Sequence, residues 1–89
     1  MIERELLVAN KLGLHARATA KLVQLLSGFR SGATLSAKGR EVNAKSIMGV
    51  MLLAAGQGTP VIVRCDGDDE QAALDAIVSL FERRFDEDS

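Results

Sequence analysis

The sequence predicts an α+β fold in which helices cover one face of a four-stranded sheet and leave the other face in water. Four short segments alternate apolar and polar side chains, and three others repeat apolar side chains every three or four residues. The segments follow one another in the order β-α-β-β-α-β-α. With 89 residues, 47% of them hydrophobic, the chain can build one small core, so we expect a single domain over residues 1–89.

The first two segments are a strand and a helix. Residues 2–8 alternate apolar and polar side chains, which predicts a strand with one buried face, and residues 10–13 break that pattern. From Ala16 onward, apolar side chains at helical spacing predict an amphipathic helix. We expect this helix to end near Ser27 and Gly28, with Gly28 as its C-cap.

A hairpin and a short helix come next. Residues 33–37 alternate, Lys38-Gly39 supplies a tight turn, and residues 40–43 form the returning strand. Ser46 is a good N-cap for a helix whose apolar spacing continues to Ala54. We expect the glycines of residues 56–58 to stop this helix.

The last strand and helix complete the predicted order. The β-branched run of residues 61–63, continued by Cys65, predicts a fourth strand before Asp66-Gly67. Asp68 and Gln71 have the spacing of a capping box at the start of the third helix. The apolar stripe of that helix is Leu74, Ile77, Val78, Phe81 and Phe85. We expect the acidic end, residues 86–88, to fray.

Composition and charge argue against several classes of partner. The formal net charge is −1 with basic residues scattered among acids, so no nucleic acid is expected as a partner. The element order would also suit a ferredoxin-like RNA-binding module, but three Phe and no Trp or Tyr leave it without stacking residues. No signal-peptide pattern or membrane-spanning apolar stretch is present. We expect a cytoplasmic protein without membrane insertion.

The chain offers few groups for enzymatic chemistry. Cys65 is the one cysteine, so it has no internal disulfide or Cys-x-x-Cys partner, and we expect it in the core. The sequence has one histidine and no glycine-rich phosphate loop. We therefore expect neither a metal site nor a cofactor, and no enzyme in the ordinary sense.

His15 lies where a predicted loop gives way to a helix. An imidazole at a helix start faces N–H groups without acceptors and the positive end of the helix dipole, which favour anions and disfavour imidazolium. A neutral, nucleophilic ring at this position could carry a phosphoryl group that the same amides and Arg17 would bind. Spacing alone also fits a His15 that only caps the helix or lies exposed.

Two motifs resolve this ambiguity. Residues 10–17 read NKLGLHAR and residues 42–51 read VNAKSIMGVM, and together they closely resemble HPr, the histidine phosphocarrier family of the bacterial phosphotransferase system. The resemblance implies an open-faced β-sandwich with a four-stranded antiparallel sheet covered on one face by three helices. It also implies that His15 is phosphorylated on its ring and that Arg17 assists the phosphoryl group.

The resemblance further implies the partners of the chain. Phosphoenolpyruvate would be the ultimate donor through enzyme I, and enzyme IIA the acceptor, with the chain acting as a monomeric, stoichiometric carrier. Residues Ile47, Met48 and Met51 match the docking patch of the family, although apolar helix residues more commonly pack into a core. Ser46 matches the site of the HPr kinase/phosphorylase of some bacteria.

One departure and two alternatives accompany the resemblance. Ala18 stands where the family commonly has Pro, which restores one N–H and relaxes the helix start. The motifs do not separate a carrier for sugar uptake from a signalling carrier of the nitrogen-related branch. A regulatory HPr-like binding protein is the other alternative, but it could dispense with the histidine that this chain has.

Overall fold

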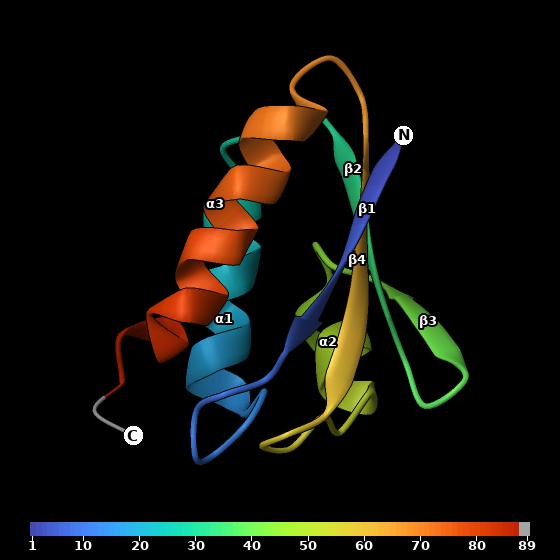
Figure 1. Cartoon of the computed structure of the whole chain (residues 1–89). Helices are drawn as coiled ribbons and strands as arrows, with labels where there is room; N and C mark the ends of the chain where they lie inside the picture. The colour runs from blue at the N-terminus through green and yellow to red at the C-terminus, as the bar shows by residue number, and fades with distance from the viewer. Residues whose placement is uncertain (88–89) are drawn as a thin grey trace.

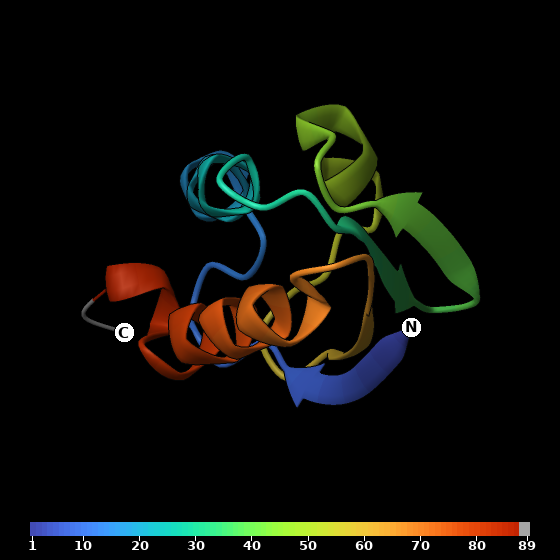
Figure 2. The same cartoon turned by 90° about the horizontal axis from the view of Figure 1, so that it is seen from above.

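The computed structural model describes residues 1–87 and contains the predicted four strands and three α-helices in the predicted order (Figure 1). The elements are β1 (Ile2–Leu7), α1 (Ala16–Leu26), β2 (Gly32–Ala37), β3 (Arg40–Asn43), α2 (Ile47–Leu52), β4 (Pro60–Asp66) and α3 (Glu70–Glu82). They form one antiparallel sheet in the order β1-β4-β2-β3. The helices lie together on one side of that sheet (Figure 2). The predicted α+β class and open-faced architecture are confirmed.

The side-chain alternation of the central strands explains why the sheet has one covered face. On β2 and β4 every second side chain is buried, and Leu35 of β2 lies opposite Val63 of β4 in the register. The β2–β3 hairpin turns at Lys38 and Gly39, both with positive φ, as a two-residue turn of type I′ requires. The strand β1 pairs with the edge of β4 opposite to β2, where Leu6 lies opposite Val61.

The core fills the space between the sheet and the helices. Its largest fully buried side chains include Phe85, Leu22, Leu26, Leu35, Ile77 and Val8. Burying one such side chain stabilises the fold by about 1.5–3 kcal/mol. Cys65 is fully buried among them, as expected, and its burial raises the pKa of the thiol.

The helix α1 ends near Ser27 as predicted, but its C-cap and the end of α2 differ from the prediction. The C-cap of α1 is Ser27, with right-handed φ of −64°, and Gly28 does not adopt the left-handed conformation expected of a C-cap glycine. The helix α2 ends at Leu52, before the glycines that were expected to stop it. Its C-cap is Leu53, and Ala54 follows with φ of 48°, so a left-handed alanine turns the chain out of the helix.

The start of α3 also differs from the prediction. The N-cap is Asp69, and the expected capping box of Asp68 and Gln71 is absent. The Asp69 carboxylate accepts hydrogen bonds from the Ser31 hydroxyl at 2.5 Å and from the backbone N–H groups of Arg30 and Ser31 at 2.8 and 2.9 Å. The Asp69 carboxylate therefore binds Ser31, which is 38 positions away in the sequence, and not the N–H groups of its own helix.

The chain after α3 forms a left-handed turn, Arg84–Asp86, with φ of 55°, 57° and 60° at three successive non-glycine residues. Each such residue costs about 1–2 kcal/mol. Full burial of Phe85 against Phe81 and a 2.8 Å hydrogen bond from Lys21 Nζ to the Phe85 carbonyl hold the turn. Phe85 thus belongs to the core but not to the helix, and the expected fraying is wrong for Asp86 and Glu87. Asp88 lies outside the described residues.

Candidate functional site

The loop before α1 is held close to the loop after α2. Gly13 has φ of 68°, and a Cβ at this position would lie 2.5 Å from the Ala55 carbonyl oxygen and 2.7 Å from Gly56 Cα. Only glycine fits this approach. The Leu14 N–H donates to the Ala55 carbonyl at 2.9 Å. These contacts fix the backbone immediately before His15.

His15 is the N-cap of α1. Its backbone is extended, and its carbonyl accepts the first hydrogen bond of the helix from Thr19 N–H at 2.9 Å. Its ring atom Nδ1 accepts from the backbone N–H of Arg17 at 3.3 Å. The Nδ1 lone pair therefore points at the amides of the first helical turn, where anions are stabilised. The side chain is 27% exposed, so the ring is held in place yet reachable.

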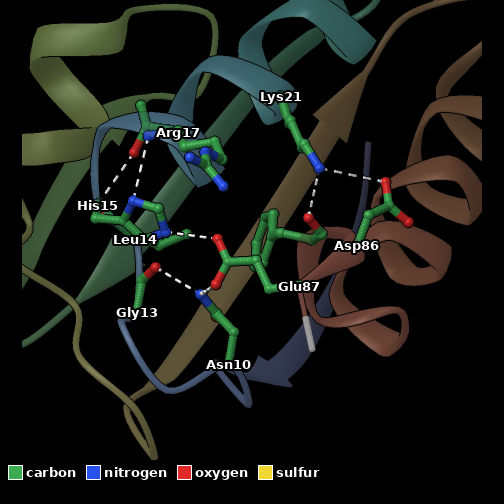
Figure 3. A network of polar contacts seen from close by, with 10 residues as sticks. Asn10, Gly13, Leu14, His15, Arg17, Lys21, Asp86 and Glu87 are labelled. Atoms are coloured by element: carbon green, nitrogen blue, oxygen red, sulfur yellow. Dashed lines mark hydrogen bonds and ion pairs between the residues drawn. The ribbon is translucent and has the colours of Figure 1, made fainter. Parts of the chain in front are cut away.

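The other ring nitrogen contacts a carboxylate from the opposite end of the chain. Glu87 Oε2 lies 2.5 Å from His15 Nε2, and Glu87 Oε1 accepts from Asn10 Nδ2 at 3.0 Å (Figure 3). Burial raises the pKa of Glu87, but the hydrogen bonds from Asn10 and His15 lower it more. With the nearby charge of Arg17, the net pKa of Glu87 lies below its ordinary value. The side chain is therefore a carboxylate at neutral pH.

Neither Asn10 nor Glu87 is among the site residues predicted from the sequence. Asn10 is completely buried and also donates to the Gly13 carbonyl at 2.8 Å, so it joins the loop to the carboxylate. Glu87 is 72 residues from His15 and sits in an acidic run typical of a solvated chain end. A buried asparagine in a loop needs a partner, but nothing local in the sequence indicates which.

Cationic side chains complete the surroundings of the ring. Arg17 is exposed in the first turn of α1, and Lys21 lies one turn further, 3.7 Å from the Asp86 carboxylate. A surface depression in this region is lined by Leu12, His15, Ala16, Arg17, Lys21, Asp86 and Glu87. Within residues 1–87 no group of three or more His, Cys, Asp or Glu side chains is arranged to hold a metal ion. The arrangement suits a nucleophilic ring beside a small anion.

The remaining predicted residues lie on α2, which packs against α1. Ser46 is the N-cap of α2, and its hydroxyl oxygen accepts from Gly49 N–H at 3.0 Å. The side chains of Ile47, Met48 and Met51 are 46%, 78% and 43% exposed, so they do not belong to the core. Ala18, by contrast, is fully buried in α1.

Comparison with known proteins identifies relatives along nearly the whole chain. Residues 2–83 match a protein-family model described as "PTS HPr component phosphorylation site". The chain is 70% identical over 89 residues to "Phosphocarrier protein HPr" of Xylella fastidiosa (strain 9a5c), covering 100% of both chains. It is 41% identical to "Phosphocarrier protein NPr" of Shewanella violacea, covering 99% of this chain and 97% of the relative.

A solved structure agrees with the fold. The structure described as "HPr-C-His from Thermoanaerobacter tengcongensis" matches with a TM-score of 0.96 and 44% identity, covering 100% of both chains. Among residues 1–87, no helix has the length and apolar character needed to span a membrane.

Proposed function

Because this chain belongs to the HPr family and is a phosphocarrier of the phosphotransferase system, we propose that His15 carries the phosphoryl group on Nδ1. The observation that supports this assignment is the contact of Nδ1 with the Arg17 backbone N–H at the start of α1. Nε2 already faces the Glu87 carboxylate, which would repel a second anion. Nδ1 is therefore the ring atom with both a lone pair and an anion-binding environment.

The first turn of α1 would bind the transferred group. A phosphoryl group on Nδ1 would replace the ring as acceptor for the Arg17 N–H and would face the positive end of the helix dipole. Ala18 is the third residue of α1, so its N–H has no carbonyl to reach within the helix and is one further donor. The Arg17 guanidinium, planar and permanently charged, can bind two phosphoryl oxygens at once.

The proposal makes the chain a stoichiometric intermediate, with one phosphoryl group on each molecule. Enzyme I would supply the group from phosphoenolpyruvate, and enzyme IIA would receive it, in the cytoplasm. Ile47, Met48 and Met51 would form the docking face, since they and Leu52 are large apolar residues exposed on one short helix that packs against α1. Flexible thioethers suit a surface that must fit more than one partner.

Labelling with enzyme I and phosphoenolpyruvate tests the assignment. Wild type should gain about one acid-labile phosphoryl group per chain, and His15→Ala should gain none, because no other side chain combines a nucleophilic nitrogen with a helix start. Circular dichroism must show that His15→Ala is folded. Full labelling of a folded His15→Ala would move the site elsewhere. The acceptor proteins labelled in a lysate of the source cell would distinguish sugar uptake from the nitrogen-related branch.

A further inference from the structure

The two oxygens of the Glu87 carboxylate are both used at the site. Oε2 contacts His15 Nε2 at 2.5 Å, and Oε1 accepts from Asn10 Nδ2 at 3.0 Å. The Glu87 side chain is only 12% exposed, although it lies close to the end of the chain. Asn10 is fixed in turn by its hydrogen bond to the Gly13 carbonyl. The carboxylate is thus held on both sides, by the loop before α1 and by the ring at its cap.

The backbone that leads to Glu87 is independently held in an unfavourable conformation. Arg84, Phe85 and Asp86 all have left-handed φ, which non-glycine residues seldom adopt even singly. The burial of Phe85, and the hydrogen bond from Lys21 Nζ to its carbonyl, maintain this turn. Strained backbone that a fold maintains often serves a functional site. Here the strained turn ends one residue before the carboxylate that reaches His15 (Figure 3).

We propose that Glu87 is a positioning residue, which keeps the proton of neutral His15 on Nε2 and stabilises the positive charge that the ring acquires during transfer. This inference rests on the proposed function of His15. A carboxylate only accepts hydrogen bonds, so its partner Nε2 must carry the proton. The lone pair of neutral His15 is then on Nδ1, in agreement with the hydrogen bond that Nδ1 accepts from Arg17 N–H.

The transfer step balances with this arrangement. The Nδ1 lone pair forms the new N–P bond, while the donor keeps the electron pair of its own broken bond to phosphorus. The ring becomes positively charged, its Nε2 proton stays in place, and the Glu87 carboxylate compensates the charge. On transfer to the acceptor the N–P bond breaks, and the ring leaves as neutral imidazole that still carries the Nε2 proton. The aspartate of serine-protease triads orients its histidine in a comparable way.

Substitution of Glu87 by Gln gives a sharp test. Because Asn10 donates toward this side chain, the glutamine must present its oxygen to Asn10 and its NH2 group to His15 Nε2. That geometry reverses the tautomer and places the proton on Nδ1. In Glu87→Ala the ring loses the carboxylate, and the 3.3 Å contact of Nδ1 with the Arg17 N–H is then what favours the Nε2–H tautomer. Glu82→Gln is the matched control, since it removes the same charge from an exposed position at the end of α3.

Two measurements on the full chain decide the proposal. Nitrogen-15 NMR of the imidazole at a pH where the ring is neutral should show an Nε2–H tautomer in wild type and Glu82→Gln, and an Nδ1–H tautomer in Glu87→Gln. The kcat for phosphorylation by enzyme I should fall about tenfold or more in Glu87→Gln, with KM unchanged. Glu87→Ala should fall between Glu87→Gln and wild type.

Several outcomes would overturn the proposal. The first is an unchanged tautomer in Glu87→Gln. The second is an equal rate of phosphorylation in Glu87→Gln and Glu82→Gln. The third is a faster rate in Glu87→Ala than in wild type, which would mean that the carboxylate obstructs the ring. Failure of the proposed function would look different, because wild type itself would then gain no phosphoryl group on His15. The tautomer measurement does not depend on phosphorylation, so the two failures are distinguishable.

Discussion

At the scale of single residues, the chemistry depends on the different partners of the two ring nitrogens of His15. One faces backbone N–H groups at the start of a helix, and the other faces the Glu87 carboxylate. The first arrangement follows from local sequence, because a histidine directly before an amphipathic helix occupies the N-cap position. The contact with Glu87 could not be predicted, because it joins residues 72 positions apart. It also depends on a left-handed turn of non-glycine residues, which no sequence pattern indicates.

Arg17 provides the first prediction at this scale. Its side chain is exposed, so Arg17→Ala should change the free energy of unfolding by no more than about 0.5 kcal/mol. Transfer from enzyme I should nevertheless fall about tenfold or more, because the guanidinium stabilises charge that develops during transfer. Arg17→Lys should recover only part of the rate, since a lysine lacks the two-pronged donor geometry. Thermal melts and enzyme I assays measure the two effects.

The matched control for Arg17 is Arg4→Ala, which removes an exposed arginine from β1. It should leave both transfer and melting temperature as in wild type. If Arg17→Ala melts at a markedly lower temperature yet transfers phosphoryl groups normally, the role of Arg17 is structural.

At the scale of elements, the sequence predicts which helices and strands form more securely than the residues at which they begin and end. The periodicity that predicts α2 continues to Ala54, but the helix ends at Leu52 because Ala54 takes a left-handed conformation that alanine seldom adopts. The start of α3 differs for another reason. Asp69 is the N-cap, yet its carboxylate binds the loop between α1 and β2 rather than its own helix. In the second case a tertiary contact overrides a local signal.

Ser46 provides a prediction about α2. Ser46→Ala removes the hydroxyl that accepts from Gly49 N–H, so it should cost about 1 kcal/mol and lower the melting temperature by about 4–8 °C. Ser46→Asp keeps a good N-cap and should preserve stability. The rate of transfer from enzyme I should rank the two variants in the opposite order, with Ser46→Ala faster than Ser46→Asp. A charge next to the exposed Met48 adds desolvation cost to docking, so Ser46→Asp should slow transfer from enzyme I by at least about threefold.

A second variant separates docking from capping. Met48→Glu places a charge on the same face without touching the cap, and it should slow transfer in the same way as Ser46→Asp. Protein phosphorylated on Ser46 should be slower still, since phosphate carries a charge of about −2. Equal transfer rates in Ser46→Asp and Ser46→Ala would reject regulation through docking.

At the scale of the whole molecule, the site depends on bringing the segment after α3 to the loop before α1. The alternation of apolar residues predicts four strands but not their order, and β1 pairs with β4 rather than with its neighbour in sequence. The pattern of elements predicted a sheet with one open face, and the resemblance to HPr added that its strands are antiparallel. The path from α3 to Glu87 passes over α1, where Lys21 holds the Phe85 carbonyl. The C-terminal segment can therefore reach His15 only in the completed fold.

The Asp69 carboxylate gives a prediction about acid stability, because it ties the start of α3 to the loop before β2. The Ser31 hydroxyl, followed by the Arg30 backbone N–H, lowers the pKa of Asp69 from its ordinary value of 3.8 to about 2. A carboxyl with a lowered pKa in the folded state stabilises the fold above its unfolded pKa. This stabilisation is lost as the pH falls from 3.8 through about 2.

Asp69→Asn should therefore melt at a lower temperature than wild type at about pH 7, and the difference should shrink toward about pH 2. An asparagine carries no charge to titrate, and one of its two terminal groups can only donate, so it cannot satisfy the three donors of Arg30 and Ser31. Asp68→Asn is the matched control, since it removes the same charge one residue earlier from an exposed side chain. Melting curves of the three proteins at several pH values measure the effect. A difference between Asp69→Asn and wild type that is the same at every pH would show that the ionised carboxylate contributes nothing. The contact between α3 and the loop before β2 would then depend on shape alone.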